Sequence, residues 1–384
     1  MIPLSVPHLD GNEWTYIKEC IDTGWVSSAG AYVTQFENRV AEYAGARFGV
    51  AASNGTAGLH LAMHLLGVNR AHHVILPNIT FIASANSAVY TGAEPIFIDI
   101  DPETWQMDLD LLEAFLAEEC QLNAQGECQH KQSGKVIKAI MPVHVLGNMC
   151  DMERLMAMAH HYQIEVVEDA SESLGAFFRG KHSGSFGRLG VFSFNGNKII
   201  TTGGGGVIVT DDEALAKRAK HLTTQAKVNP ETYWHDEIGF NYRLVNVLAA
   251  MGVAQMEQLD AFIEKKKYID AFYREQLAGL GDIRFQKVVP EVDANCWLMT
   301  IRSTEQARLL QELKAHQIIA RPFWTPMNQL PMFTQHIYYH RADHSRRIHE
   351  ECLSIPSSVN ITDAQLQEVV GAIARVFQNE TKLC

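Results

Sequence analysis

Apolar residues are arranged along the first part of the chain in two alternating patterns. Apolar positions three and four residues apart predict helices at residues 12–23, 33–44, 56–66 and 83–90. Short continuous apolar runs predict strands at residues 48–51, 74–76, 95–100, 138–145, 164–168, 190–194 and 206–209. Strands that alternate with helices of this length predict crossover connections and a largely parallel, buried sheet, so we expect the α/β class.

The pattern changes twice further along the chain. Residues 117–136 are polar and lack periodicity, so we expect a surface excursion there. From about residue 245 a long helix is predicted over residues 249–277, followed by short strands and helices. A chain of 384 residues exceeds the usual size of one domain. We therefore predict a large domain at residues 1–244, which includes the N-terminal segment, and a smaller domain at 245–384.

Composition excludes several classes of protein. The formal net charge of −12 argues against broad nucleic-acid binding, although a local pocket can still be basic. No apolar run approaches the roughly 18 residues that a membrane span needs, and the N-terminus lacks the basic start of a secretory signal. The seven cysteines are irregularly spaced and form no CxxC pair, which disfavours a disulfide framework or a zinc site. We expect a cytoplasmic protein with no metal, membrane or nucleic-acid partner.

The first segment with candidate chemistry is a polar turn that presents a lysine. An apolar strand runs into Ser193–Lys198, and a glycine-rich bend follows at residues 203–206. Burial lowers the pKa of a lysine, and a deprotonated lysine forms covalent bonds with carbonyl partners. The alternative is a surface lysine beside a hairpin, which the local sequence by itself favours.

The second segment is a strand that ends in two acids, Glu168 and Asp169. In an open α/β sheet, ligands bind beyond the carboxyl ends of the strands. A carboxylate at that place can keep a pyridine nitrogen protonated, which makes the ring an electron sink. The alternative is that both acids cap a following helix.

The third segment, Asn54-Gly55-Thr56-Ala57, leads from a strand into a helix. The amides of a helix N-terminus form a phosphate site, and Gly55 permits close backbone approach. Ordinary N-capping is the alternative, and the segment is neither a Walker loop nor a dinucleotide motif. A phosphate turn, a strand-end carboxylate and a turn lysine together meet the needs of pyridoxal 5′-phosphate (PLP), so the sequence predicts a PLP enzyme.

At these residues the chain resembles the DegT/DnrJ/EryC1/StrS family of sugar-nucleotide aminotransferases. The matching motifs are NGTA at 54–57, PxxTFxAxAN at 77–86, PVH at 142–144, EDA at 168–170, FSF…K…TT.GGG at 192–206 and G.NYR at 239–243. The resemblance extends from residue 24 to residue 358. It implies the PLP-dependent transferase fold type I, with a mostly parallel central sheet sandwiched by helices and a smaller α+β C-terminal domain.

The resemblance also implies a role for each site residue. Lys198 would form the Schiff base with PLP and then carry the proton, and Asp169 would pair with the pyridine nitrogen. Phe81 would stack on the ring, and Glu172 would lie near the cofactor's 3-hydroxyl. The phosphate would be held by Gly55, Thr56, Ala57 and Ser193, joined by Asn241 of a partner subunit, which implies a homodimer with shared active sites. The alternatives are core packing for Phe81 and a helix cap for Asn241.

Two further segments bear on the substrate. Residues 194–203 and 321–327 look most like the LegC and bacillosamine-pathway 4-aminotransferases, which implies UDP-2-acetamido-2,6-dideoxy-hexos-4-ulose as substrate and L-glutamate as amino donor. Arg321 would bind the substrate phosphates, and Trp25 and Ser28 would line the sugar site. The alternatives are a structural ion pair for Arg321 and core packing for Trp25.

Two other functions remain open at this point. A GDP-perosamine synthase-type reaction on GDP-4-keto-6-deoxymannose is the nearest alternative. A non-catalytic PLP-binding or nucleotide-binding module is the alternative from a different class, and the acidic charge and the presence of Lys198 disfavour it. Related sugar 3-dehydratases carry histidine in place of the lysine, so Lys198 favours transamination.

Overall fold

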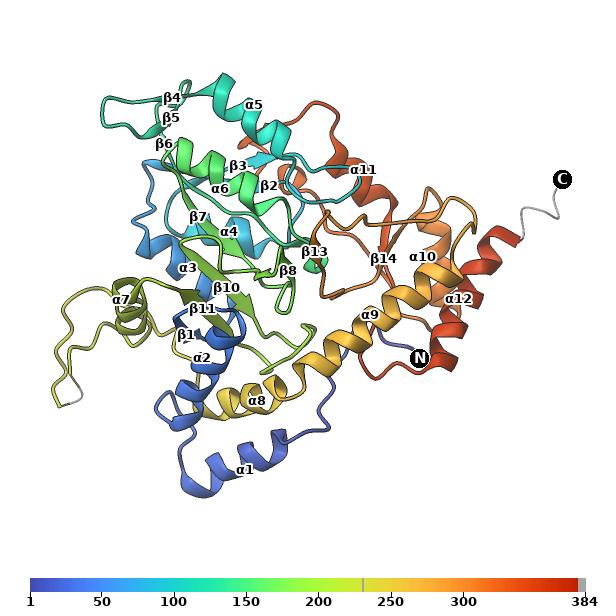
Figure 1. Ribbon diagram of the computed structural model, residues 1–384, viewed down its shortest axis with the longest axis horizontal. Helices are drawn as coiled ribbons and strands as arrows, with labels where there is room; N and C mark the ends of the chain where they lie inside the picture. Colours follow the sequence, from blue (N-terminus) through green and yellow to red (C-terminus); the bar gives the residue numbers. More distant parts are fainter. Residues whose placement is uncertain (230, 379–384) are drawn as a thin grey trace.

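The structure is a computed structural model that describes residues 1–229 and 231–378. A mixed sheet lies at the centre of the molecule (Figure 1). Its main path is β1 (Phe48–Ala52), β11 (Gly206–Thr210), β10 (Leu189–Ser193), β7 (Glu165–Asp169), β6 (Val136–Ile140), β2 (His72–Pro77), β3 (Glu94–Ile98) and β16 (Ile337–Tyr339). Along this path only β11 runs antiparallel to its neighbours. The expected α/β class with a mostly parallel sheet is confirmed.

Both faces of the sheet are covered, which explains why its strands are continuous apolar runs rather than alternating ones. Within β2, for example, Val74 and Leu76 pack into the core on one face and Ile75 packs into the core on the other. The first face is covered by α3 (Gly55–Leu65), α4 (Ala83–Tyr90) and α7 (Glu213–Thr223). The second is covered by α2 (Ala31–Tyr43), α5 (Leu109–Glu119), α6 (Met152–His161) and α8 (Asn246–Met256).

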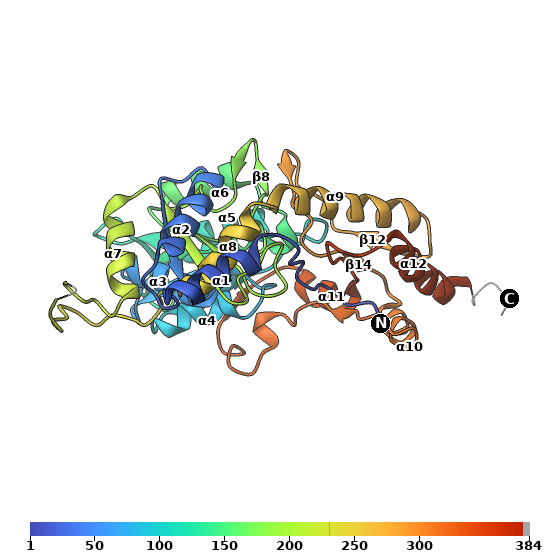
Figure 2. The ribbon, with the colours of Figure 1, turned by 90° about the horizontal axis from the view of Figure 1, so that it is seen from below.

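A second layer of helices and strands lies beside the large sheet (Figure 2). Its antiparallel sheet has the order β12 (Arg284–Phe285), β14 (Thr300–Arg302), β17 (Cys352–Ser354) and β15 (Arg321–Pro322). The helices around it are α9 (Leu259–Gln276), α10 (Gln306–Ala315), α11 (His344–Glu351) and α12 (Asp363–Gln378). Its apolar core includes Ile269, Tyr273 and Leu313, all fully buried. This layer matches the smaller α+β part that the sequence predicts.

Contacts cross the predicted domain boundary at residue 244 in both directions along the chain. Ile2 at the N-terminus forms a bridge with Ile318 of the smaller layer. In the other direction, α8 packs on α2 and on α1 (Glu13–Thr23), and β16 joins the edge of the large sheet. The boundary itself stays a prediction, and its last residues, 379–384, lie outside the described part of the chain.

The expected surface excursion at residues 117–136 includes the end of α5 and a largely exposed hairpin of β4 (Cys120–Leu122) and β5 (Cys128–His130), and β5 pairs with β6. Its strands are too short for a period to show. The long helix expected at 249–277 is two helices, α8 and α9, that are separated at residues 257–258.

The remaining short elements are β8 (Phe177–Phe178), β9 (Lys181–His182), β13 (Val292–Asp293) and two 3-10 turns, Val145–Gly147 and Met327–Gln329. Among the described residues, no helix is both long and apolar enough to span a membrane.

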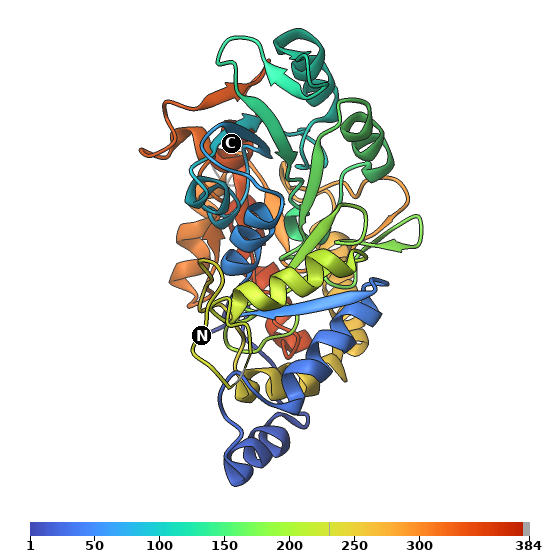
Figure 3. The ribbon, with the colours of Figure 1, turned by 90° about the vertical axis from the view of Figure 1, so that its left-hand side faces the viewer.

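Strand direction gathers the predicted site segments at one edge of the sheet (Figure 3). Because β1 and β10 both run antiparallel to β11, they point the same way as β7 and β2. The carboxyl ends of β1, β10, β7 and β2 therefore share one edge, where ligands of open α/β sheets bind.

Candidate active site

Lys198 lies in a tight turn after β10, where its backbone N–H donates to the carbonyl of Asn195 at 3.0 Å. Only 13% of its side chain is exposed, so the alternative of a surface lysine is wrong. Its Nζ lies 3.6 Å from Oε1 of Glu172. Burial lowers the pKa of Lys198, while the carboxylates of Glu172 and Asp169 oppose this effect. The amine therefore loses its proton more readily than a free lysine does, as a nucleophile requires.

Glu172 lies in the turn after β7 with 4% of its side chain exposed. Its Oε2 accepts a hydrogen bond of 2.9 Å from the backbone N–H of Leu146. Burial raises the pKa of Glu172 to about 7, although the Lys198 ammonium and this amide act in the opposite direction. A carboxyl group with a pKa near neutrality can donate a hydrogen bond when protonated and accept one when ionised. Either form could bind the cofactor's 3-hydroxyl group, which the family resemblance places near Glu172.

The free energy of unfolding of the cofactor-free protein should depend less on pH when Glu172 is replaced by glutamine. The pKa of about 7 lies above the ordinary value of 4.5, so the folded state binds this proton more tightly than the unfolded state does. The stability that Glu172 contributes is therefore complete below about pH 4.5 and is lost as the pH rises through about 7. Across that window we expect the free energy of unfolding to fall by on the order of 3 kcal/mol more in the wild type than in the variant. Urea unfolding at several pH values measures this difference, and parallel pH profiles would contradict the assignment.

Asp169 ends β7 and is 4% exposed. Its Oδ2 accepts a hydrogen bond of 2.6 Å from the Ser84 hydroxyl, and its Oδ1 accepts one of 3.1 Å from the backbone N–H of Ser171. No helix begins in the segment that follows, residues 170–176, so the helix-cap alternative is wrong. The carboxylate is held at the sheet edge, on the same side as Lys198.

Glu168 has a different function from its neighbour. Its carboxylate accepts hydrogen bonds from the backbone N–H groups of Gly184, Phe186 and Gly187, at 2.6 to 2.7 Å. It also contacts His144 Nε2 at 2.9 Å. The Glu168 carboxylate therefore stabilises the loop before β10. Of the two neighbouring acids, Asp169 is the one available to a ligand.

The phosphate turn comes directly after β1. The Asn54 side chain accepts a hydrogen bond of 2.8 Å from the N–H of Ala57, so it is indeed an N-cap. In the described chain the N–H groups of Gly55 and Thr56 have no hydrogen-bond acceptor, and they stand at the positive end of α3. Capping and phosphate binding are therefore compatible at this turn, while a role for the Ala57 amide stays a prediction.

Two hydroxyl groups approach this turn. A Cβ atom added at Gly55 would lie 2.8 Å from Ser193 Cβ, 3.1 Å from Ser193 Oγ and 3.4 Å from Ser171 Oγ. Gly55 is required because any side chain would strike Ser193. Amides of a helix terminus beside two hydroxyls form a suitable cradle for a phosphate group.

Three other predicted ligand residues are exposed. Phe81 is 57% exposed and Trp25 is 59% exposed, so core packing is wrong for both. The Phe81 carbonyl accepts a hydrogen bond from Ser84, which also contacts Asp169, so Phe81 lies beside the site. Trp25 and the exposed Ser28 lie between α1 and α2, and the contacts of this loop run to Asn246. Their role in sugar binding stays a prediction.

Asn241 and Arg321 are also exposed. Asn241 forms a bridge with Thr224, and since α8 begins only at Asn246, the helix-cap alternative is wrong. Arg321 lies on the edge strand β15 and makes no ion pair with any described residue, which removes the structural alternative for it. The roles of both residues toward ligands stay predictions.

Sequence reasoning missed three residues that contact the core of the site. Ser84 holds Asp169, Ser171 approaches the phosphate turn, and Trp297 covers the Lys198 amine. Ser84 falls within the motif at 77–86, which is a usable signal. Trp297 follows no motif and comes from the smaller layer, so the sequence contains no signal that would join it to Lys198.

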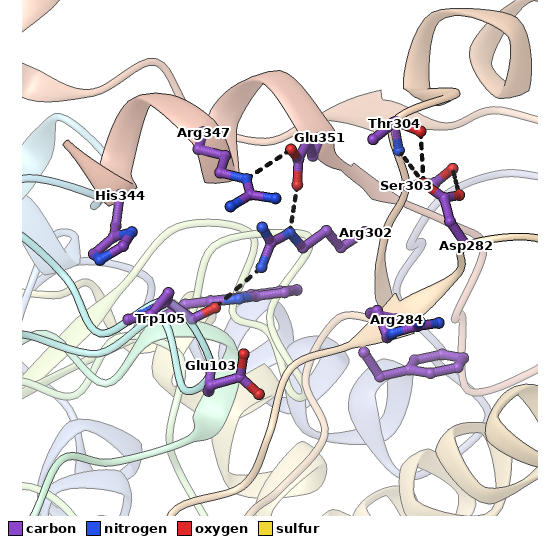
Figure 4. A pocket seen from close by; sticks show the side chains of 12 residues that line it. Glu103, Trp105, Asp282, Arg284, Arg302, Ser303, Thr304, His344, Arg347 and Glu351 are labelled. Atoms are coloured by element: carbon purple, nitrogen blue, oxygen red, sulfur yellow. Dashed lines mark hydrogen bonds and ion pairs between the residues drawn. The ribbon is translucent and has the colours of Figure 1, made fainter. Parts of the chain in front are cut away.

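A separate cavity has a lining that does not include Lys198 (Figure 4). It measures about 510 Å³ and is lined by Glu103 and Trp105 and by side chains of the smaller layer. Several of its charges are already paired, since Glu351 accepts hydrogen bonds from Arg302 at 2.6 Å and from Arg347 at 2.9 Å. We therefore place the reaction at the smaller hollow lined by Ser171, Glu172, Ser193, Lys198, Asn295 and Trp297.

One group of side chains in the described residues has the spacing of metal ligands. His221, Asp236 and Glu237 have ligand atoms within 4.8 Å of one another. Asp236 contacts His221 at 2.7 Å, and Glu237 contacts Arg218 at 2.9 Å. These contacts are ordinary surface ion pairs, and the expectation of no metal stays a prediction.

The residues at this edge fit PLP. A buried amine, a fixed carboxylate and a phosphate cradle lie at the carboxyl ends of neighbouring strands, as a PLP-dependent aminotransferase requires. Lys198 would hold the cofactor's aldehyde, Asp169 its pyridine nitrogen, and Gly55, Thr56 and Ser193 its phosphate.

Comparison with known proteins agrees with this class. The model of the DegT/DnrJ/EryC1/StrS aminotransferase family matches residues 7–374, and the chain belongs to this family, which is PLP-dependent. The GDP-perosamine synthase of Caulobacter vibrioides is 38% identical over 386 residues, with 98% of each chain covered. That of Escherichia coli O157:H7 is 36% identical over 382 residues, with 99% of each covered. A DegT DnrJ EryC1 StrS aminotransferase from Brucella abortus superposes with a TM-score of 0.87 at 25% identity, covering 95% of each chain.

Proposed function

We propose that the protein transfers the amino group of L-glutamate to C4 of a GDP-linked 4-keto-6-deoxy sugar, as in a GDP-perosamine synthase-type reaction. The observation that carries the aminotransferase part is the buried Lys198 amine, 3.6 Å from Glu172 and on the same side of the sheet as Asp169. The GDP-linked sugar is supported by two relatives of that name, which align with nearly the whole chain. They favour it over the UDP-2-acetamido sugar that the motifs at 194–203 and 321–327 suggest.

Each residue of the site has a defined task in this reaction. When bound, PLP accepts the electrons that the donor's α-carbon releases. Lys198 takes the proton from that carbon and later returns one, because burial lowers the pKa of its amine and makes the neutral form more accessible. Asp169 is held in place by the hydrogen bonds from Ser84 and Ser171, and its carboxylate would stabilise a positive charge on the pyridine nitrogen. Phe81 offers an exposed ring to cover the site.

A panel of substrates tests this proposal. The purified protein with PLP and L-glutamate is given GDP-4-keto-6-deoxymannose, UDP-2-acetamido-2,6-dideoxy-hexos-4-ulose and a TDP-linked 4-keto sugar, and mass spectrometry identifies the amino-sugar products. We expect the highest kcat/KM with the GDP-linked sugar. A higher kcat/KM with the UDP-linked sugar would overturn the assignment of substrate while leaving the aminotransferase class intact.

Replacing Arg321 by alanine should raise KM for the nucleotide sugar about ten- to a hundredfold with little change in kcat. The reason is that a guanidinium binds a diphosphate equally in the ground state and the transition state. Arg284 provides a matched control, because it is an exposed arginine on β12, at the opposite edge of the same sheet. Steady-state kinetics of Arg321→Ala and Arg284→Ala measure the difference. Equal KM values for the two variants would contradict the role of Arg321.

We further propose that the enzyme works in the cytoplasm as a homodimer with shared sites. A segment after α7 projects from the large domain (Figure 1) and exposes Tyr233, Trp234 and Ile238 by 94%, 67% and 87%. Apolar side chains on a projecting segment support contact with a second subunit, to which Asn241 would then contribute. Sedimentation analysis of the wild type should give twice the mass of one chain.

A further inference from the structure

The feature that the proposed mechanism does not use is a segment of the smaller layer, residues 295–297, that crosses the turn of Lys198. Trp297 Nε1 donates a hydrogen bond of 2.7 Å to the carbonyl oxygen of Asn197, the residue before Lys198. The face of the same indole lies 4.0 Å from Lys198 Nζ, measured to the ring centroid. Trp297 is only 2% exposed and the Lys198 side chain 13%, so this contact is largely shielded from solvent. One side chain thus fixes the backbone of the turn and covers the amine that it presents.

The same segment also holds the other ionisable neighbour of the amine. Asn295 Nδ2 donates hydrogen bonds to the carbonyls of Glu172, at 2.8 Å, and Leu174, at 2.9 Å. Its Oδ1 accepts the backbone N–H of Trp297 at 3.0 Å. Glu172 and Lys198 are therefore tied to one short stretch of chain, which maintains their separation of 3.6 Å.

A second buried amine anchors this stretch. Lys266 of α9 is 2% exposed, and its Nζ donates hydrogen bonds to the carbonyls of Trp297, at 2.8 Å, and Ser357. Burying a lysine costs free energy unless its N–H groups have hydrogen-bond acceptors. Because the Trp297 carbonyl is one of the two acceptors, Lys266 fixes the backbone position of Trp297. The hydrogen bond from Nε1 to Asn197 holds the indole beside Lys198.

We propose that Trp297 is a positioning residue for Lys198: its N–H fixes the catalytic turn, and its ring face receives the amine in its cationic form. This inference rests on the proposed aminotransferase function. Between taking a proton from the donor's α-carbon and returning it, Lys198 is an ammonium group in a buried site. The electron-rich face of an indole attracts such a cation, and most strongly where water is absent. Glu172 and Asp169 supply the remaining attraction.

The alternative is that Trp297 only fills the core, and a matched tryptophan separates the two explanations. Trp105 belongs to the same apolar cluster, is 1% exposed and packs on Phe323. A core role predicts that Trp297→Leu and Trp105→Leu behave alike toward Lys198. A positioning role predicts an effect on Lys198 from Trp297 alone.

The experiment uses the cofactor-free full-length protein, so its outcome does not depend on the identity of the sugar. Acetic anhydride modifies neutral amines, and mass spectrometry follows the modification of Lys198. We divide the rate of Lys198 acetylation at about pH 7 by the rate at about pH 10, where the amine is more fully neutral. This ratio corrects for differences in how accessible Lys198 is to the reagent. Without the indole face the ammonium is less stable, so Trp297→Leu should raise this ratio about three- to tenfold, whereas Trp105→Leu should leave it unchanged. An unchanged ratio in Trp297→Leu, or an equal rise in Trp105→Leu, would overturn the proposal.

A milder variant tests the hydrogen bond separately and serves if Trp297→Leu does not fold. Trp297→Phe keeps an aromatic face but loses the N–H group, so the acetylation ratio should change by less than about twofold. Hydrogen exchange in the peptide that contains residues 195–200 should become about tenfold faster, because the loss of one hydrogen bond frees the turn. Exchange at the wild-type rate would overturn the role of the N–H group. If both variants behave as expected while no sugar is aminated, the proposed function fails and the assignment of Trp297 to Lys198 remains.

Discussion

Replacing Lys198 by alanine should abolish transamination, with kcat reduced by about 10⁴-fold or more, because the variant loses both its covalent attachment point and its general base. PLP should still bind, since the phosphate turn at residues 54–57 and Asp169 are unchanged, but the absorbance band of the imine should be absent. Absorbance spectroscopy and an assay of 2-oxoglutarate release measure the two effects. Turnover at the wild-type rate would exclude Lys198 as the catalytic residue.

Lys266 provides the control for this prediction, because it is a lysine of the described residues that is only 2% exposed and so even more buried than Lys198. Burial lowers its pKa to about 7, so a low pKa does not distinguish it from Lys198. Its amine faces backbone carbonyls of Trp297 and Ser357 rather than carboxylates at the sheet edge. Lys266→Met should therefore retain the imine band even if it unfolds more easily. Loss of the band in Lys266→Met with retention in Lys198→Ala would reverse the assignment.

Replacing Asp169 by asparagine should lower kcat by about 10²- to 10³-fold, the usual effect of removing one fixed electrostatic partner. Asparagine keeps the size of the side chain and can still accept the hydrogen bond from Ser84, so the expected loss arises from the charge. Without that charge the pyridine nitrogen is protonated less, and the ring accepts electrons less well. Stopped-flow measurement of the half-reaction with glutamate isolates this step from sugar binding.

Ser84→Ala is the matched variant for Asp169. It keeps the carboxylate group and removes one hydrogen bond of 2.6 Å, so we expect a loss of only about tenfold. If Asp169→Asn were as active as the wild type, the pairing with the pyridine nitrogen would be wrong. If Ser84→Ala were the more damaging change, the position of the carboxylate would matter more than its charge.

Much of the fold follows from patterns that are local in the sequence. The β2 strand is a continuous apolar run because it is buried on both faces, and the helix at 83–90 has the period of one buried face. Hydrophobic patterns do not predict an element that is very short. They also miss a break between two helices where no glycine or proline marks it. The β4–β5 hairpin has three residues in each strand, and α8 passes into α9 at residues 257–258 without glycine or proline.

The site divides in the same way. Lys198, Asp169 and Gly55 can be identified from the sequence because each stands where a strand passes into a turn, and strand direction then brings those turns together. The raised pKa of Glu172 cannot be predicted in this way. It depends on burial, on the contact with Leu146 and on the distance to Lys198. The contact of Trp297 with Lys198 joins residues 99 positions apart in the chain, and only packing between the two layers creates it.

Borohydride reduction of the purified protein with PLP, followed by peptide mass mapping, tests the central claim most directly. Reduction turns an imine into a stable bond and marks the lysine that formed it. We expect one labelled peptide, with the cofactor's mass added at position 198. A label on Lys266 or on a surface lysine, with Lys198 left unmodified, would contradict the whole account of the site.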